Sequence, residues 1–107
     1  MKKIITMLIV LFTVTPVYAD WIYPCGDIER MRTWANGNDT YGIWIEYKNN
    51  PSSCSGGFYV RHAATNKNLV FSMVLAAKTA GQRICIQTNP LYNMIGSRCL
   101  VNYVYHE

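Results

Sequence analysis

Four cysteines constrain the fold of this chain more than any other feature of its sequence. They stand at Cys25, Cys54, Cys85 and Cys99 in a chain of 107 residues. A domain of this size is marginally stable without cross-links, and exported proteins commonly supply them as disulfides. The spacing contains neither a Cys-x-x-Cys redox motif nor a zinc-ligand pattern. We therefore expect two structural disulfides and no bound metal.

Four cysteines allow three pairings, and their spacing alone does not choose among them. A hairpin folded about Gly37-Asn38 would bring Cys25 close to Cys54. A second hairpin, centred near Tyr92, would place the two C-terminal cysteines opposite each other. The favoured pairing is therefore Cys25–Cys54 with Cys85–Cys99, and the main alternative is Cys54–Cys99.

The N-terminal residues are typical of a secretory signal peptide. Lys2 and Lys3 precede an apolar run from Ile4 to Val14, and the small-residue pattern Val17-Tyr18-Ala19 follows it. Because threonines and a proline interrupt this short run, it favours a leader over a transmembrane anchor. We expect residues 1–19 to be cleaved after Ala19, and the mature protein, residues 20–107, to be one domain in the periplasm or the medium.

The charges and motifs of the mature chain exclude several functions. Without Lys2 and Lys3, 8 of the 10 basic side chains remain against 6 acidic ones, a formal charge of +2. The basic residues are scattered, which argues against nucleic-acid binding. No nucleophile, metalloprotease or phosphate-loop motif is present. We expect a non-enzymatic protein without a cofactor; a small hydrolase using His62 and His106 is a distant third hypothesis.

Turn-forming residues divide the mature chain into six segments. One of them should be a helix that begins at Asn66 or Asn68 and ends at Gly81, where a left-handed residue is favoured. The first strand needs a bulge near Glu29 or Arg30 to put its apolar residues on one face. The expected strands are Gly26–Ala35, Tyr41–Lys48, Phe58–His62, Arg83–Thr88 and Arg98–His106.

This order, with one helix between the third and fourth strands, is that of the OB-fold, a five-stranded Greek-key barrel. The alternative is a generic small α+β sheet with a helix across it. On the helix, a core-facing stripe is expected to contain Leu69, Val70, Met73, Val74, Ala77 and Ala80. Phe71 and Leu75 fall on the far side, either simply exposed or forming a subunit interface.

Aromatic residues are abundant in the mature chain and favour a binding module over an enzyme. Exposed tryptophan and tyrosine rings beside amide and carboxylate groups can stack on sugars. Trp44 points away from the apolar face formed by Ile43 and Ile45, which makes it a candidate for such stacking. The Trp and Tyr residues are Trp21, Tyr23, Trp34, Tyr41, Trp44, Tyr47, Tyr59, Tyr92, Tyr103 and Tyr105.

The chain resembles the B, or binding, subunits of one-A-five-B bacterial toxins of the subtilase-cytotoxin and typhoid-toxin type. The resemblance covers nearly all of residues 20–106. It rests on the Trp21-Ile22-Tyr23 lead-in, the alternating pair of strands, and "VFSMVLAAKTAGQRICIQ" from Val70 to Gln87. In that family an alanine-rich helix runs through a glycine turn into a basic, β-branched strand, as Ala76–Ile84 does here.

The resemblance implies an OB-fold, a ring of five subunits and a partner catalytic A subunit. It also implies binding of host glycans that end in sialic acid. By position, the family's glycan site would fall on Tyr23, Asp27, Glu46 and Lys48, to which the residues themselves add Trp44. The alternative is a solitary exported protein that binds or inhibits another protein.

Overall fold

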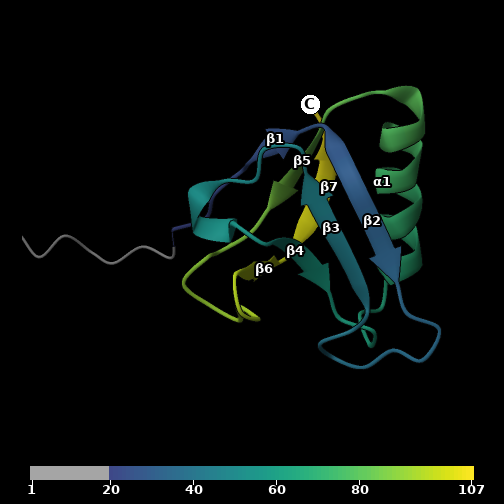
Figure 1. Ribbon diagram of the computed structural model, residues 1–107, viewed down its shortest axis with the longest axis vertical. Coiled ribbons are helices and arrows are strands. Elements are labelled where there is room, and N and C mark those ends of the chain that lie inside the picture. The colour runs from purple at the N-terminus through teal and green to yellow at the C-terminus, as the bar shows by residue number, and fades with distance from the viewer. Residues whose placement is uncertain (1–19) are drawn as a thin grey trace, which may run out of the picture.

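The structure, a computed structural model, describes residues 20–107, so the expected signal peptide lies outside the described residues. The described chain is mainly β with one α-helix, and its seven strands form two sheets (Figure 1). Its elements in chain order are β1 (Cys25–Gly26), β2 (Ile28–Thr33), β3 (Ile43–Tyr47), the 3-10 helix η1 (Ser52–Cys54), β4 (Gly57–Val60), α1 (Lys67–Ala80), β5 (Ile84–Gln87), β6 (Arg98–Leu100) and β7 (Tyr103–His106).

The larger sheet has the strand order β2-β3-β4-β6. Strands β2 and β3 form an antiparallel hairpin in which Thr33 faces Ile43, so the turn is centred where the Gly37-Asn38 pair predicts. The register shifts between Ile28 and Arg30, which confirms the predicted bulge. Strand β6 joins β4 in parallel.

The smaller sheet has the order β1-β5-β7, and two chain segments contribute to both sheets. Strand β1 leads into β2 through Asp27, and β6 leads into β7 through Val101-Asn102. The sequence predicts five unbroken strands, whereas these two breaks make seven. Among residues 20–107 the strand pairings give two sheets and no closed barrel. The part of the predicted fold class that is confirmed is a mainly β domain with one helix.

The disulfides join Cys25 to Cys85 and Cys54 to Cys99. The favoured pairing was therefore wrong, and its stated alternative, Cys54–Cys99, is the bridge present. The first strand is interrupted at Asp27, so Cys25 lies outside the β2–β3 hairpin. It pairs instead with Cys85 in the smaller sheet. The predicted hairpin centred near Tyr92 was also wrong, because Cys85 faces Tyr105 instead of Cys99.

Helix α1 packs against β2 and β7 and covers one side of the core (Figure 1). Val74 and Ala77 are fully buried, and Val70, Phe71 and Met73 pack partly buried against the same core. The core includes residues of both sheets: Ile28, Ile43, Ile45, Tyr47, Phe58, Val60, Ile84 and Ile86.

Two expectations for the helix faces need correction. Phe71 belongs to the core side, because it lies only about 60° around the helix from Val74 and its large ring reaches back to the core. Leu69, expected in the core stripe, is 63% exposed, and Ala80 is exposed as well. Leu75 is 45% exposed, as expected of the far face.

The ends of α1 follow the sequence signals in part. Gly81 adopts a left-handed φ of 64°, and its backbone N–H donates to the carbonyls of Ala77 and Lys78, as predicted. Asn66 precedes the first turn, but its side chain makes no capping hydrogen bond. Within residues 20–107, no helix is long and apolar enough to cross a membrane.

Candidate ligand-binding surfaces

The five residues predicted to bind a glycan lie in three different surroundings. Trp44 and Glu46 project from the outer face of the larger sheet, opposite the buried Ile43, Ile45 and Tyr47. Tyr23 is exposed beside β5, where its hydroxyl accepts a hydrogen bond from Gln87 at 3.2 Å.

Asp27 and Lys48 lie together at the C-terminal end of the helix. The Lys48 backbone N–H donates to the Asp27 carbonyl at 2.9 Å. Both residues line a hollow of about 240 Å³ that also includes Lys78 and Gly81. The structure therefore brings together the pair Asp27 and Lys48 and the pair Trp44 and Glu46, but not the five as one site.

Trp44 belongs to a cluster of three aromatic rings, Trp34, Tyr41 and Trp44, which we call the sheet-face cluster. The ring centroids of Trp34 and Trp44 are 4.7 Å apart, and those of Tyr41 and Trp44 are 5.6 Å apart in a stacked arrangement. Trp34 and Tyr41 are 5.1 Å apart. The Trp44 indole N–H donates to the Thr40 carbonyl at 2.8 Å. The rings thus mainly contact one another.

Two arginines cover the remaining surface of Trp44. The Arg98 guanidinium lies 3.5 Å from the centroid of the Trp44 ring, and that of Arg32 lies 5.7 Å away. Arg98 is also 4.0 Å from Glu46, which in turn lies 3.8 Å from Arg30. These cation–π contacts leave Trp44 little free ring face for a sugar.

A glycine lies beside Arg98 in the larger sheet. Gly57 pairs with Arg98 between β4 and β6. Gly57 has a φ of +97°, and a β-carbon at that position would lie 2.4 Å from the Ile45 carbonyl and 3.1 Å from Glu46. Glycine at residue 57 thus allows β4 to lie close to β3, beside the strand from which Arg98 extends to Glu46 and Trp44.

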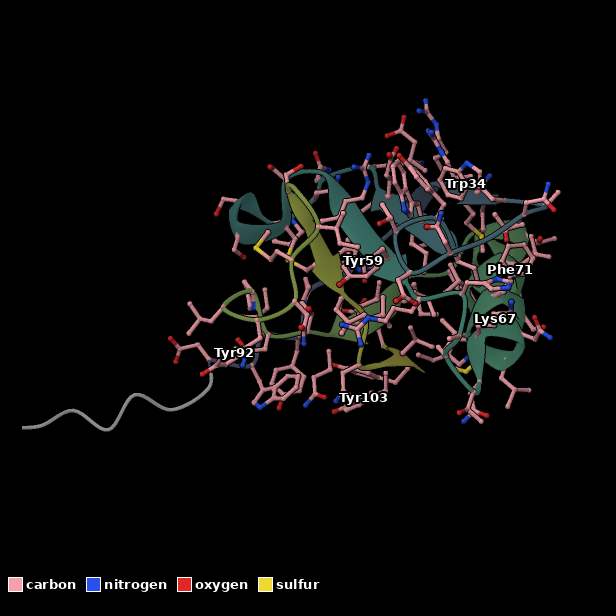
Figure 2. The ribbon with its side chains drawn as sticks, turned by 90° about the horizontal axis from the view of Figure 1, so that it is seen from below. Trp34, Tyr59, Lys67, Phe71, Tyr92 and Tyr103 are labelled. Atoms are coloured by element: carbon pink, nitrogen blue, oxygen red, sulfur yellow. A yellow bond between two sulfur atoms is a disulfide. The ribbon has the colours of Figure 1, made fainter. Side chains whose placement is uncertain are left out.

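A second aromatic surface, at the other end of the molecule, is open. It contains a pocket of about 190 Å³. Figure 2 shows Tyr92 of this surface at the opposite end from Trp34, with Tyr59 between them. We call it the amide pocket; its lining residues are Trp21, Asn89, Tyr92, Asn93, Leu100 and Asn102.

The aromatic side chains of the amide pocket are exposed. Trp21 is 44% exposed and Tyr92 is 59% exposed. Trp21 is positioned by its neighbour Ile22, whose backbone exchanges two hydrogen bonds with Thr88 at 2.9 and 3.1 Å. In contrast to Trp44, neither Trp21 nor Tyr92 has a ring or cation contact among the described aromatic pairs of residues 20–107.

The loop that carries Tyr92 is held by its own asparagines. Asn89 is 6% exposed, and its side-chain oxygen accepts a hydrogen bond from the Leu91 N–H at 3.0 Å. The Tyr92 N–H donates to the Asn89 carbonyl at 3.2 Å. Asn93 adopts a left-handed φ of 58°, which asparagine tolerates better than most residues.

Tyr59 supports this loop from beneath. Its hydroxyl donates to the Asn93 carbonyl, and the residue is almost fully buried. Burial raises the pKa of Tyr59 above its ordinary value, an effect that nearby Arg61 partly opposes. The phenol therefore keeps its proton at neutral pH and remains a hydrogen-bond donor to the loop.

A chain of amides links the amide pocket to Tyr23. The Asn102 side chain donates to the Gln87 side-chain oxygen, and Gln87 donates to the Tyr23 hydroxyl. The Asn102 backbone N–H also donates to the Gln87 carbonyl at 2.9 Å. Tyr23 is thus the one predicted glycan-binding residue that the structure connects to this pocket.

Sequence reasoning missed most of the residues that line the amide pocket. Trp21 enters the sequence interpretation only as an aromatic residue and through the toxin-like lead-in, Tyr92 only as an aromatic residue and a hairpin centre, and Asn93 and Asn102 not at all. A usable signal was present, because residues 84–97 contain no charged side chain yet include Leu91, Tyr92 and Met94. An uncharged loop with large exposed side chains is unusual on a protein surface.

The described residues offer no obvious metal centre: within residues 20–107, no three His, Cys, Asp or Glu side chains gather to hold an ion. In comparisons with known proteins, this chain matches no family model, no curated protein and no solved structure.

Proposed function

We propose that this chain is an exported, non-enzymatic carbohydrate-binding protein and that the amide pocket is its binding site. The observation that carries the proposal is the pocket's composition. An exposed indole and an exposed phenol flank three asparagine side chains in a hollow of about 190 Å³.

This combination suits the two kinds of surface on a sugar. The C–H groups of a pyranose form an apolar patch that stacks on an aromatic ring. Its hydroxyls both donate and accept hydrogen bonds, as the amide group of asparagine also does. Trp21 or Tyr92 would provide the platform, while Asn93 and Asn102 would bind the hydroxyls.

The pocket is also held in shape before a ligand arrives. Asn89, Tyr59 and the Ile22–Thr88 bridge fix the backbone on which Trp21 and Asn93 stand. A site that is ordered in advance loses less conformational entropy on binding. Such an ordered site favours the binding of a sugar, a polar ligand that binds weakly.

The OB-fold remains part of the proposal. The strand pairings support it once β1 is joined with β2 and β6 with β7. The first joined segment then pairs with β3 through β2 and with β5 through β1. The last runs parallel to β4 through β6 and antiparallel to β5 through β7.

The export, the pentameric ring and the catalytic A subunit also stay proposals, resting on the leader-like residues 1–19 and on the resemblance to toxin B subunits. Two disulfides suit an oxidising destination such as the periplasm or the medium. Of the two residues offered for the ring interface, Leu75 keeps the exposure that such a role needs.

A second candidate function, binding to another protein, is favoured by the same loop. Leu91, Tyr92 and Met94 are all exposed large side chains on a loop whose base is anchored by Cys99. Such a projecting apolar loop is suited to entering a partner's cleft. The two functions differ in which side chains they need, since Leu91 and Met94 do not line the amide pocket.

The test is a glycan array probed with the oxidised protein, produced by export from the full-length chain. Trp21→Ala and Tyr92→Ala should each weaken binding by about tenfold or more, because each removes a stacking surface. Trp44→Ala is the matched control and should retain binding, since Trp44 lies in the sheet-face cluster.

Loss of binding in Trp44→Ala alone, with the variant still folded by circular dichroism, would transfer the site to the outer face of the larger sheet. Absence of any glycan signal, together with a partner whose binding needs Leu91 and Met94, would favour the protein-binding function.

A further inference from the structure

We infer that the amide pocket selects an uncharged sugar unit and discriminates against acidic sugars. This inference rests on the proposed function and names its ligand class. It differs from the sialic-acid ligand that the resemblance implies.

The lining of the pocket is electrically neutral. Its side chains are two aromatic rings, three amides and one leucine: Trp21, Tyr92, Asn89, Asn93, Asn102 and Leu100. A carboxylate brought into contact with this lining would lose part of its hydration and gain only neutral donors in return. A hydroxymethyl group in the same place would be matched by the amides.

The arginine nearest in sequence to the pocket is engaged elsewhere. Arg98 lies two residues before Leu100, but its guanidinium is stacked on Trp44 at 3.5 Å and lies 4.0 Å from Glu46. To meet a ligand in the pocket, Arg98 would have to give up both contacts. The register reinforces this separation, because Arg98 sits beside Gly57, whereas Leu100 sits beside Tyr59.

The charged residue next to the pocket in the sequence is acidic, and the nearby Arg61 lies beside the buried Tyr59 and does not line the pocket. Asp20 directly precedes Trp21 in the chain and is exposed. Cleavage of the leader after Ala19 would create an α-amino group on Asp20. Its positive charge would roughly cancel the negative charge of the Asp20 carboxylate, so the mature N-terminus would not form a cationic site.

The size of the pocket limits what it holds. About 190 Å³ is below the roughly 300 to 1,000 Å³ of most small-molecule sites. It therefore suits one sugar ring, with the rest of a longer glycan outside. Because Asn102 and Asn93 come from different segments, they would contact different hydroxyls of that ring.

The experiment compares neutral sugars with acidic counterparts; in two pairs a hydroxymethyl group is replaced by a carboxylate, and in the third a whole acidic residue is added. Isothermal titration of the oxidised protein would use three pairs: methyl glucoside and methyl glucuronide, methyl galactoside and methyl galacturonide, and N-acetyllactosamine and its sialylated form. In whichever pair binds, we expect the acidic member to bind about tenfold more weakly or worse. Binding of the neutral member should be nearly the same from about 50 mM to about 500 mM NaCl, since no ion pair is screened.

Asn102→Ala and Trp21→Ala test whether the neutral sugar binds in the amide pocket. Each substitution should weaken the binding of the neutral sugar by about tenfold. Glu46→Gln, on the outer sheet face, is the control and should change nothing.

An acidic sugar that binds more tightly than its neutral partner, and that depends on Trp21, would overturn the inference while leaving carbohydrate binding intact. Binding of neutral sugars that survives both pocket variants would also overturn it, because the selecting site would lie elsewhere. If neither member of any pair binds, and the glycan array is empty as well, the proposed function falls together with the inference.

Discussion

The two aromatic surfaces of this protein contain similar side chains in opposite states. In the sheet-face cluster, Trp44 is surrounded by two rings and capped by Arg98, and its indole N–H is bonded to a backbone carbonyl. In the amide pocket, Trp21 and Tyr92 stand apart beside asparagine side chains. Trp44 has made its contacts within the chain, although its neighbour Tyr41 is 41% exposed, whereas Trp21 and Tyr92 are both open to solvent.

The difference separates a stabilising role from a binding role. A ring whose faces are already covered contributes to folding, and a ligand would have to displace its neighbours. A ring left exposed on a rigid loop contributes little to folding and can contribute to binding. Counting aromatic residues in the sequence does not make this distinction, because a covered ring and an exposed ring add to the count alike.

The largest expected effect contrasts the two tryptophans. Trp44→Ala should lower the free energy of unfolding by about 2 to 3 kcal/mol, because a half-buried ring in a packed cluster is lost. Trp21→Ala should lower it by less than about 0.5 kcal/mol. Urea unfolding followed by circular dichroism measures both. A larger loss for Trp21 than for Trp44 would reverse the comparison.

Tyr47 provides a third, fully internal aromatic residue for reference. Its hydroxyl donates to the carbonyls of Pro24 at 3.0 Å and Ile84 at 2.9 Å, linking β3 to the smaller sheet. Tyr47→Phe leaves these acceptors without the phenol and should cost about 1 to 2 kcal/mol in urea unfolding. Glycan binding should not change, since the amide pocket lies elsewhere.

Tyr47 should also make stability sensitive to alkaline pH. Burial raises the pKa of Tyr47 above its ordinary value, with a smaller contribution from Tyr105. The folded state therefore holds this proton more tightly than the unfolded state does. The resulting stability is complete below about pH 10 and is lost as the pH rises toward the folded-state pKa. Unfolding midpoints between pH 8 and about pH 11 should fall less steeply in Tyr47→Phe than in the unaltered protein.

Substitution of Arg98 tests whether its cation–π contact with Trp44 stabilises the fold. Arg98→Met keeps much of the side-chain volume but removes the guanidinium, and should cost about 1 kcal/mol. Arg32→Met is the matched control, and its greater distance of 5.7 Å from the ring predicts a smaller loss. Equal losses for both variants would mean that the 3.5 Å contact has no special weight.

The smallest effect on monomer stability is expected at the exposed helix face. Leu75→Lys should change the free energy of unfolding of a monomer by less than about 0.5 kcal/mol, because Leu75 already faces solvent. In a ring of the kind that the resemblance implies, the same change should release monomers, which sedimentation would detect. An unaltered protein that sediments as a monomer at micromolar concentration would remove the interface role of Leu75.

Local sequence signals predicted the local parts of the fold well. The turn about Gly37-Asn38, the bulge between Ile28 and Arg30 and the left-handed Gly81 each depend on a few neighbouring residues. The longer-range features were harder. The pairing of β5 with β7 is centred three residues later than predicted, since Cys85 faces Tyr105. The reason is that Arg98–Leu100 pairs with β4, so the strand that returns to β5 begins only at Tyr103.

The candidate site was less accessible to sequence reasoning than the fold. Alternation along β3 correctly placed Trp44 outside the core, but it does not say which neighbours cover an outward ring. Arg98 reaches Trp44 from a strand more than fifty residues away in the sequence. The amide pocket draws on Trp21, the loop after β5 and the break between β6 and β7, which no single stretch of sequence contains.

The interleaving of the two disulfides has a consequence for how the chain matures. Cys25 pairs with the third cysteine and Cys54 with the fourth, so the loop closed by each disulfide contains one cysteine of the other. If the chain is exported from its N-terminus, as we propose, Cys25 and Cys54 emerge before either correct partner. An oxidant that joins cysteines in order of arrival would make Cys25–Cys54, which must then be reshuffled through thiol–disulfide exchange. Yield in an oxidising compartment should accordingly depend on disulfide isomerase activity more than on oxidising strength.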